Sequence, residues 1–241
     1  MLKEIECYGL SDIGHVRANN EDLWIELPEY QFYALADGMG GHNAGEVAAK
    51  EAILELCDAI DKLFIENNKP SIEKAKQGIK QGVCASNRWV RSLSKEHSLL
   101  SGMGTTLCCT LILQETLIYT HLGDSRIYLF RKKLKQLSED HTSTQQIFDP
   151  QTNQIRLKTV ITQAIGTSSH VDPLIHTLSL ENDDLILLCS DGLSDHLSDK
   201  EIEQFLKEPL SLKDLAHHLV DEAKEKGGKD NITVVLIRFK K

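Results

Sequence analysis

The chain has 241 residues and a formal net charge of −9, with 27 Lys and Arg against 36 Asp and Glu. This acidic balance, without any stripe of Lys or Arg, argues against binding to the phosphate backbone of nucleic acids. No apolar run approaches the roughly 20 residues that cross a bilayer, and the N-terminus lacks a secretory signal pattern. The six cysteines form no C-x-x-C pair, so we expect a soluble cytoplasmic protein whose thiols are buried and not bridged.

The strands that we expect are apolar runs bounded by polar turns. In chain order they cover residues 31–36, 106–113, 116–122, 126–131, 175–180, 185–189 and 232–239. Short polar turns follow several of them, at Gln114-Glu115, near Lys132 and at 181–184. Short turns join antiparallel neighbours, since parallel strands need long crossovers, so the sequence predicts antiparallel sheets.

Helices are expected in two blocks between these strands. Apolar residues recur at helical spacing over 45–66 and again from Ser71, a predicted N-cap, to Val90. Later helices are expected near 199–207 and 212–226, the last ending at a Gly-Gly pair. Antiparallel strands with inserted helix pairs indicate a single α+β domain over 1–241, built on two packed sheets with helices outside. The polar stretch at about 143–160 is expected to be a mobile surface loop.

Five acidic positions lie beside the expected strands or among glycines. They are Asp22, Asp37, Asp124, Asp191 and Asp230. Carboxylates gathered at strand ends repel one another unless a cation lies between them. Because hard divalent cations prefer oxygen ligands, the pattern predicts a site for more than one Mg²⁺ or Mn²⁺ ion.

The order of the motifs around these residues is more specific than any one of them. The segments are SDIGHVRANNEDLW, ALADGMGGHNAGEVAA, GMGTTL, LGDSRIY, DHT, ITQAIG, LLCSDGLSD and GGKDNITVVLI. Together, over about 11–238, they resemble the metal-dependent Ser/Thr protein phosphatases of the type 2C class, and most of all the compact bacterial type. The resemblance implies a four-layer α/β/β/α sandwich, in agreement with the sheets and helix pairs expected above.

The resemblance also implies the metal ligands. Asp37 would bridge two ions, with the carbonyl of Gly38 on the second ion. Asp191 and Asp230 would complete the coordination of the first ion. Asp124 would help Asp191 to hold a third and weaker ion. The cofactors implied are therefore Mn²⁺ or Mg²⁺.

Other residues match positions that act on water or phosphate. Glu21 and Asp22 would act through metal-bound water, and Arg17 would grip the substrate phosphate. The mechanism implied is direct attack on phosphorus by a hydroxide that bridges the metals, without a covalent intermediate. Two residues depart from the family pattern. Met39 replaces a proton-donating histidine of many eukaryotic relatives, so a metal-bound water would have to donate that proton, and Gln163 replaces a usual arginine, which puts substrate preference in question.

Simpler roles compete for several of these residues. Asp124 would otherwise cap the Gly123 turn or pair with Arg126. Asn231 is expected either to bond within its loop or to support a metal-bound water, and Asp195 either to act behind the ligands or to cap the next turn.

The histidines lack the spacing of a zinc site. His121, within an expected strand, is interpreted as a packed core histidine, and His42 is a minor candidate near the site.

The predicted function is hydrolysis of phosphoserine and phosphothreonine in proteins phosphorylated by a Ser/Thr kinase. A binding module of the same fold without activity, a pseudophosphatase, is the alternative; it predicts missing ligands, and none is missing. A narrower substrate, such as a small phosphoester or one dedicated regulator, stays open. No exposed apolar stripe stands out, so a monomer is expected.

Overall fold

The computed structural model describes residues 4–41, 44–149 and 154–241, with side chains described outside 147–156. The strands are β1 (Glu4–Asp12), β2 (Asp22–Leu27), β3 (Phe32–Met39), β4 (Gly104–Thr105), β5 (Leu107–Leu113), β6 (Thr116–Leu122), β7 (Arg126–Arg131), β8 (Lys133–Gln136), β9 (Thr142–Asp149), β10 (Gln154–Ile161), β11 (His176–Ser179), β12 (Asp184–Cys189) and β13 (Ile232–Lys240). The helices are α1 (Ala44–Asn67), α2 (Ile72–Glu96), α3 (Asp191–Ser194), α4 (Asp199–Leu206) and α5 (Leu212–Glu225), with a 3₁₀ turn η1 (Ser98–Leu100).

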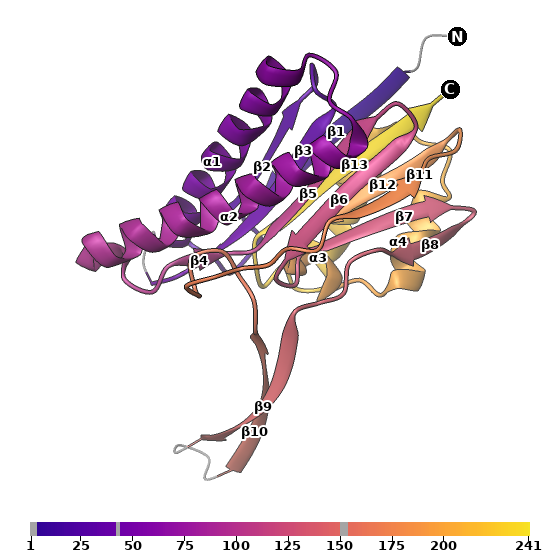
Figure 1. Cartoon of the computed structure of the whole chain (residues 1–241). Helices are drawn as coiled ribbons and strands as arrows, with labels where there is room; N and C mark the ends of the chain where they lie inside the picture. The colour runs from indigo at the N-terminus through magenta and orange to yellow at the C-terminus, as the bar shows by residue number, and fades with distance from the viewer. Residues whose placement is uncertain (1–3, 42–43, 150–153) are drawn as a thin grey trace.

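Two antiparallel sheets form the centre of the molecule (Figure 1). Sheet A has the strand order β1-β13-β12-β7-β8, and sheet B has the order β11-β6-β5-β3-β2, with β4 attached to β3. Helices α1 and α2 cover the outer face of sheet B, while α5 packs on β1 and β13 of sheet A and contacts α4. The predicted α/β/β/α sandwich is confirmed.

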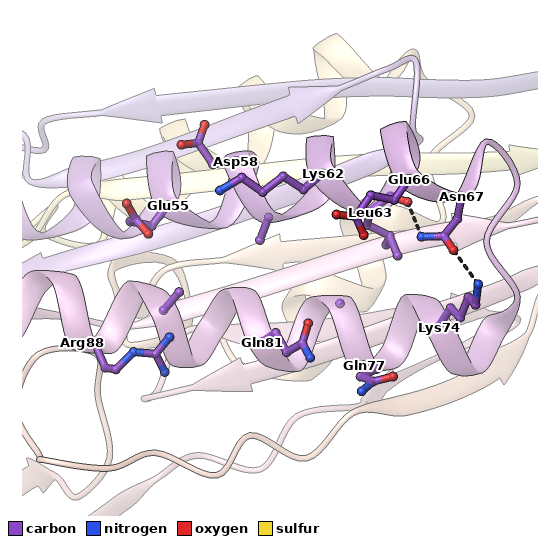
Figure 2. A pocket seen from close by; sticks show the side chains of 13 residues that line it. Glu55, Asp58, Lys62, Leu63, Glu66, Asn67, Lys74, Gln77, Gln81 and Arg88 are labelled. Atoms are coloured by element: carbon purple, nitrogen blue, oxygen red, sulfur yellow. Dashed lines mark hydrogen bonds between the residues drawn. The ribbon is translucent and has the colours of Figure 1, made fainter.

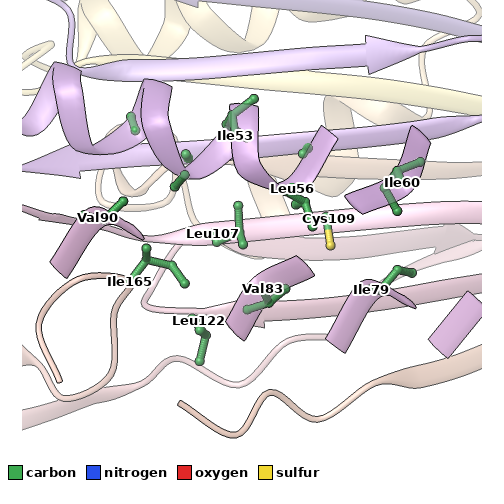
Figure 3. Close-up of a cluster of buried hydrophobic side chains, with 14 of the residues drawn as sticks. Ile53, Leu56, Ile60, Ile79, Val83, Val90, Leu107, Cys109, Leu122 and Ile165 are labelled. Atoms are coloured by element: carbon green, nitrogen blue, oxygen red, sulfur yellow. The ribbon is translucent and has the colours of Figure 1, made fainter. Parts of the chain in front are cut away.

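Central strands bury both of their faces because side chains alternate along a strand. In β12, Leu187 packs toward α4 and α5, whereas its neighbours Ile186 and Leu188 pack between the sheets. In β5, Leu107 and Leu111 pack toward α1 and α2, as Figure 3 shows for Leu107. These strands therefore appear in the sequence as continuous apolar runs without polar alternation.

The turn between α1 and α2 ends at the N-cap that the sequence predicts. Ser71 caps α2, its Oγ accepting a hydrogen bond from the N–H of Lys74 at 3.3 Å. At the end of α1, Asn67 donates to the carbonyl of Leu63 at 2.8 Å and accepts from the ammonium of Lys74 at 2.6 Å (Figure 2). The two helices border a polar groove of about 620 Å³, lined by both acidic and basic side chains. None of its lining residues is a predicted site residue.

The strands absent from our prediction lie mostly at sheet edges. β1 and β8 are the two edges of sheet A, and β2 is one edge of sheet B. The residues of β1 are only half-buried or exposed, and those of β8 alternate between the same two states. Edge strands need no continuous apolar run, so the sequence signal at these places is weak.

One predicted pairing is wrong. The short turn at 181–184 does not join paired strands, since β11 pairs with β6 in sheet B and β12 pairs with β7 and β13 in sheet A. The turn crosses between the layers with Asp183 at φ 66°. The buried carboxylate of Asp184 is held there by Arg131, at 2.5 and 2.7 Å.

The segment at about 143–160 also differs from the loop that we expect. It forms a regular antiparallel hairpin, β9–β10, paired from Thr142↔Ile161 to Asp149↔Gln154. Figure 1 shows this hairpin standing away from the sandwich. Its strands are rich in polar residues and in β-branched Thr, Ile and Val, a composition that suits an exposed ribbon.

All six cysteines are free, as the sequence predicts. Cys108, Cys109 and Cys189 are buried as expected, whereas Cys7, Cys57 and Cys84 are only half-buried. Among the described residues, no helix is long and apolar enough to cross a membrane.

Candidate functional site

Four of the five acidic positions meet at one edge of the sandwich, because strands from both sheets end there. Asp37 lies near the end of β3, Asp124 follows β6, Asp191 follows β12 and Asp230 precedes β13. They share a cavity of about 190 Å³. Its lining is Arg17, Glu21, Asp37, Gly38, Met39, Gly40, Thr106, Asp124, Ile161, Asp191 and Asp230. We call it the acidic cavity.

Asp37 is fixed by its backbone. Its N–H donates to the Thr106 hydroxyl at 3.0 Å, and its carbonyl accepts from the Thr105 hydroxyl and the Thr106 N–H, both at 2.9 Å. Burial, followed by the charges of the neighbouring aspartates, raises the pKa of the Asp37 carboxyl well above its usual range. Its ionised form therefore needs a positive partner.

Asp22 lies beside Asp37 in the β2–β3 register and does not line the acidic cavity. Its Oδ2 accepts hydrogen bonds from Ser190 at 2.8 Å and from Thr233 at 2.6 Å. Burial raises the pKa of Asp22 to about 6, against the opposing effect of these two hydroxyls. Asp22 thus joins β2 to Ser190, which precedes Asp191, and to the start of β13, which follows Asp230.

Asp124 and Asp191 each leave one carboxylate oxygen without a partner. The Oδ1 atoms of both are buried and accept no hydrogen bond. Burial raises the pKa of both carboxyls, that of Asp191 to about 7. Buried polar atoms are rarely left without partners. Oδ1 of Asp22 has no partner either, so these oxygens fit contact with a cation at this edge of the molecule.

Arg17 reaches this edge from the loop between β1 and β2. Its Nη2 lies 2.5 Å from Oδ2 of Asp230, and its side chain remains 50% exposed. The bond to Asp230 raises the pKa of the guanidinium, which stays charged. Asn231 ties the same loop down, because its amide donates to the carbonyls of Ile13 and Asn19, each at 3.0 Å. Asn231 therefore bonds within the loops.

Two glycines let the loops approach closely. A Cβ on Gly38 would lie 2.1 Å from the carbonyl oxygen of Gly45, and one on Gly192 would lie 2.0 Å from that of Asn231. Any larger residue would separate the Asp37 and Asp191 turns from their neighbours.

The carboxylates share a cavity without forming a finished ligand set. Within the described parts of the chain, no three His, Cys, Asp or Glu side chains are arranged so that they could hold a metal ion. Like charges keep such groups apart when no cation lies between them, and Asp230 is turned to Arg17. The donor chemistry fits a hard divalent cation, because every charged ligand candidate is a carboxylate.

The contacts of Arg126 and Asp195 exclude one of the alternative roles that the sequence left open for Asp124 and for Asp195. Arg126 does not pair with Asp124; it forms a bidentate pair with Asp140, 2.7 Å from Nη2 to Oδ2. Asp195 does not cap the next helix, whose N-cap is Ser198.

His121 is packed as expected but only half-buried, so it is not a residue of the core. Its Nε2 lies 2.7 Å from the carbonyl oxygen of Glu139, and its ring stacks on His141 with 4.6 Å between centroids. His42 lies outside the described residues. Met39 lines the acidic cavity and Gln163 does not.

Sequence reasoning missed the hydroxyls that support the carboxylates. Thr106, Ser190 and Thr233 contact Asp37 or Asp22 directly. Each lies in a motif segment quoted above, GMGTTL, LLCSDGLSD or GGKDNITVVLI. Their positions within these segments were the available signal.

These features define a class of four-layer α/β/β/α proteins with an acidic, cation-attracting cavity at the edge where both sheets meet. Comparison with known proteins identifies the family. The family model described as protein phosphatase 2C matches residues 15–232. The protein phosphatase PhpP of Streptococcus pneumoniae is 33% identical over 238 residues, which cover 95% of each chain.

Solved structures agree with this match. The serine/threonine phosphatase PstP/Ppp of Mycobacterium tuberculosis superposes with a TM-score of 0.82 at 33% identity, over 98% of this chain and 99% of that one. The catalytic domain of PstP in complex with two manganese ions matches with a TM-score of 0.82 at 33% identity, over 100% of both chains. The chain belongs to the protein phosphatase 2C family, and the predicted enzyme class, a protein phosphatase, is confirmed.

Proposed function

We propose that the chain hydrolyses phosphoserine and phosphothreonine in proteins with the help of Mn²⁺ or Mg²⁺. The observation that carries the proposal is the pair of buried, partnerless Oδ1 atoms on Asp124 and Asp191. They border a cavity that also contains Asp37 and the only arginine of its lining, Arg17. The manganese in the PstP structure and the names of the relatives support the same metal and substrate classes.

The ligand roles in this proposal follow the sequence. Asp37 and the carbonyl of Gly38 would hold two ions, Asp191 and Asp230 would complete the first, and Asp124 would bind a third ion with Asp191. When bound, the ions would activate water for attack on phosphorus and neutralise charge on the phosphoryl oxygens.

Arg17 would bind and orient the substrate phosphate. Its bond to Asp230 uses one Nη2 hydrogen, so other donors of the guanidinium remain for phosphate oxygens. Glu21 lines the cavity and would act through water. Asp22 lies beside the cavity without lining it and would act by holding the residues next to Asp191 and Asp230 in place. Met39 has no proton to give, so the leaving alkoxide would take its proton from water.

The test is hydrolysis of p-nitrophenyl phosphate and of a phosphothreonine peptide with Mn²⁺ and with EDTA. Activity should require the metal, and Asp37→Asn and Asp191→Ala should each lower kcat by about 100-fold or more. Asp58→Asn, an exposed carboxylate on α1, is the matched control and should keep full activity. Activity in EDTA, or activity that survives both site substitutions, would contradict the proposal. Tight binding of phosphoprotein without turnover would instead favour the pseudophosphatase.

Metal binding by Asp124→Ala separates the third ion from the first two. Calorimetry with Mn²⁺ should show loss of the weakest ion and retention of the two tighter ones. Only one remaining ion in this variant would show that Asp124 belongs to the first pair.

We also propose that the substrates are proteins phosphorylated by a Ser/Thr kinase of the same cell. A cytoplasmic, monomeric enzyme is consistent with this role. Phosphoproteome comparison with and without the gene would identify the substrates.

A further inference from the structure

A second cavity lies beside the acidic cavity and shares Asp230 with it. Its volume is about 410 Å³, and its lining is Asp195, His196, Lys226, Lys229 and Asp230. We call it the side cavity. A ligand bound to the metals through one group would extend past Asp230 to reach it.

The turn that carries Lys229 is held in place by His196. The Nδ1 atom of His196 lies 2.9 Å from the carbonyl oxygen of Gly192, and its Nε2 accepts from the N–H of Lys229 at 3.4 Å. Gly227 and Gly228 take positive φ values of 137° and 52°, which suit a tight turn at this place. The ring therefore joins the turn after Asp191 to the turn before Asp230.

The aliphatic part of Lys229 lies against this turn. Its Cε is 3.8 Å from the position that a Cβ on Gly227 would take, and the His196 ring lies 3.6 Å from the same point. Lys229 is exposed, so its ammonium remains in contact with solvent at the side cavity.

The cations near the two cavities differ in whether they are already paired. Arg17 is bonded to Asp230. Lys226 is bonded to Glu201, lowering the pKa of that carboxyl to about 2, and lies 3.9 Å from Glu222.

Within the described residues, Lys229 makes no ion pair. It is therefore the cation at these cavities that is available to a ligand. Asp195 lines the same cavity and is also exposed. It forms no ion pair with Lys229, and solvent screens the charges of both side chains.

We propose that Lys229 binds an anionic side chain of the substrate next to the phosphoresidue under attack, and that the enzyme prefers phosphosites with such a neighbour. The anion is a carboxylate or a second phosphate, since an ammonium binds both as a point charge. This proposal rests on the phosphatase function proposed above. An extended peptide advances about 3.3–3.6 Å per residue, so a residue within a few positions of the phosphoresidue can reach the adjoining cavity.

The preference would arise from the charge around the site. The acidic cavity and the side cavity together are lined by more carboxylates than cations, so an anionic peptide is repelled until metals and Lys229 offset that charge. Lys229 then favours peptides that bring a second anion and offers nothing to a small substrate such as p-nitrophenyl phosphate.

The experiment compares kcat/KM for three phosphothreonine peptides of one sequence. The flanking positions carry Gln, Glu or phosphoserine. In the wild-type enzyme, kcat/KM should be about threefold to fivefold higher with Glu than with Gln, and higher again with phosphoserine. The Lys229→Ala variant should reduce both ratios to about one, Lys229→Glu should invert them, and Lys229→Arg should preserve them.

Lys213→Ala is the matched control. Lys213 is exposed on α5, and the 13 residues from it to Lys226 span about 20 Å of helix length. It removes the same charge far from the cavity and should keep the wild-type ratios.

Two outcomes would overturn the proposal. One is a wild-type enzyme without preference among the peptides, and the other is an unchanged preference in Lys229→Ala. A general loss of structure in a variant would lower all three rates together and leave the ratios unchanged, which also counts against Lys229. Absence of activity toward every phosphopeptide and p-nitrophenyl phosphate would instead refute the proposed phosphatase function.

Discussion

Arg17 touches Asp230, so a residue expected to hold phosphate contacts a residue expected to hold a metal. The contact gives each side chain a defined orientation before any ligand binds. Half of the Arg17 side chain remains exposed, so the pair is screened by solvent and contributes little to stability. The contact therefore matters for how the two side chains are oriented toward a ligand, and little for the stability of the fold.

Arg17→Ala should raise KM for a phosphopeptide about 10- to 100-fold and lower kcat less, because it removes charge-assisted hydrogen bonds to the phosphate. Arg17→Lys should recover part of the loss, since an ammonium lacks the planar fork. Arg88→Ala, which changes an exposed arginine on α2, is the control. Steady-state kinetics with the phosphopeptide measure kcat and KM for each variant. A fall in kcat with unchanged KM would contradict the phosphate-binding role.

At the scale of elements, α1 and α2 approach each other through a small residue. A Cβ on Gly82 would lie 2.8 Å from the Cβ of Ala59 and 2.9 Å from a methyl of Leu56. Ala59 cannot move away by changing a rotamer. By contrast, the three atoms nearest to a Cβ on Gly78 all belong to the flexible end of Leu63, at 3.1 Å or more.

The two glycines therefore predict opposite effects of one substitution. Gly82→Ala should lower the free energy of unfolding by about 1–3 kcal/mol through overpacking. Gly78→Ala should raise it by up to about 1 kcal/mol, because alanine favours the helix. Urea unfolding of both variants measures the difference, and equal effects would show that the helix interface yields.

The β9–β10 hairpin is an element whose main contacts are between its own two strands. Among the described side chains of the hairpin, that of Ile161, at its base, lines the acidic cavity. A two-stranded ribbon contributes little stability by itself.

Replacing residues 144–159 by Asn-Gly would join the paired residues Ser143 and Val160 through a tight turn. The free energy of unfolding should stay unchanged within error, and p-nitrophenyl phosphate should still be hydrolysed. Turnover of a whole phosphoprotein should fall, because the ribbon borders the approach to the cavity. Loss of both activities together would show that the hairpin supports the site itself.

At the scale of the whole molecule, buried carboxyls make stability depend on pH when metal is absent. Burial raises the pKa of Asp22 to about 6, against about 3.9 for Asp in an unfolded chain. The folded state then binds more protons than the unfolded state, so this group's contribution to stability falls as pH rises from about 4 to about 6. His121 and His141, whose pKa values burial lowers, act in the opposite direction below about pH 6.5.

Comparison with Asp22→Asn isolates the carboxyl from these histidines. In EDTA, the stability of Asp22→Asn relative to wild type should increase between pH 4 and pH 7, by up to about 3 kcal/mol. Denaturant unfolding at several pH values gives this difference. Excess Mn²⁺ should reduce the fall in wild-type stability at higher pH, because metal replaces protons at the neighbouring carboxylates. A difference that does not change with pH would show that Asp22 ionises normally.

The sequence by itself determined the buried part of the fold. Central strands such as β5 and β12 are apolar on both faces, and Ser71 caps α2 as expected, because burial and capping act through local residue patterns. The order of the motifs in the sequence was also enough to indicate the family of this chain. Strand β1 and the crossing at Asp183 were not predictable in this way, since their pairing depends on partners distant in the chain. Strands β2 and β8 and the β9–β10 hairpin pair with near neighbours, but they lack the continuous apolar run of a buried strand.

Only the tertiary structure decided how the acidic residues differ from one another. Asp37, Asp124, Asp191 and Asp230 share a cavity, whereas Asp22 lies beside it under two hydroxyls. Burial and hydrogen-bond partners set these differences, and both are fixed by residues up to 213 positions apart in the chain. For the same reason, the role proposed for Lys229 depends on the ion pairs that occupy Arg17 and Lys226 in the folded chain.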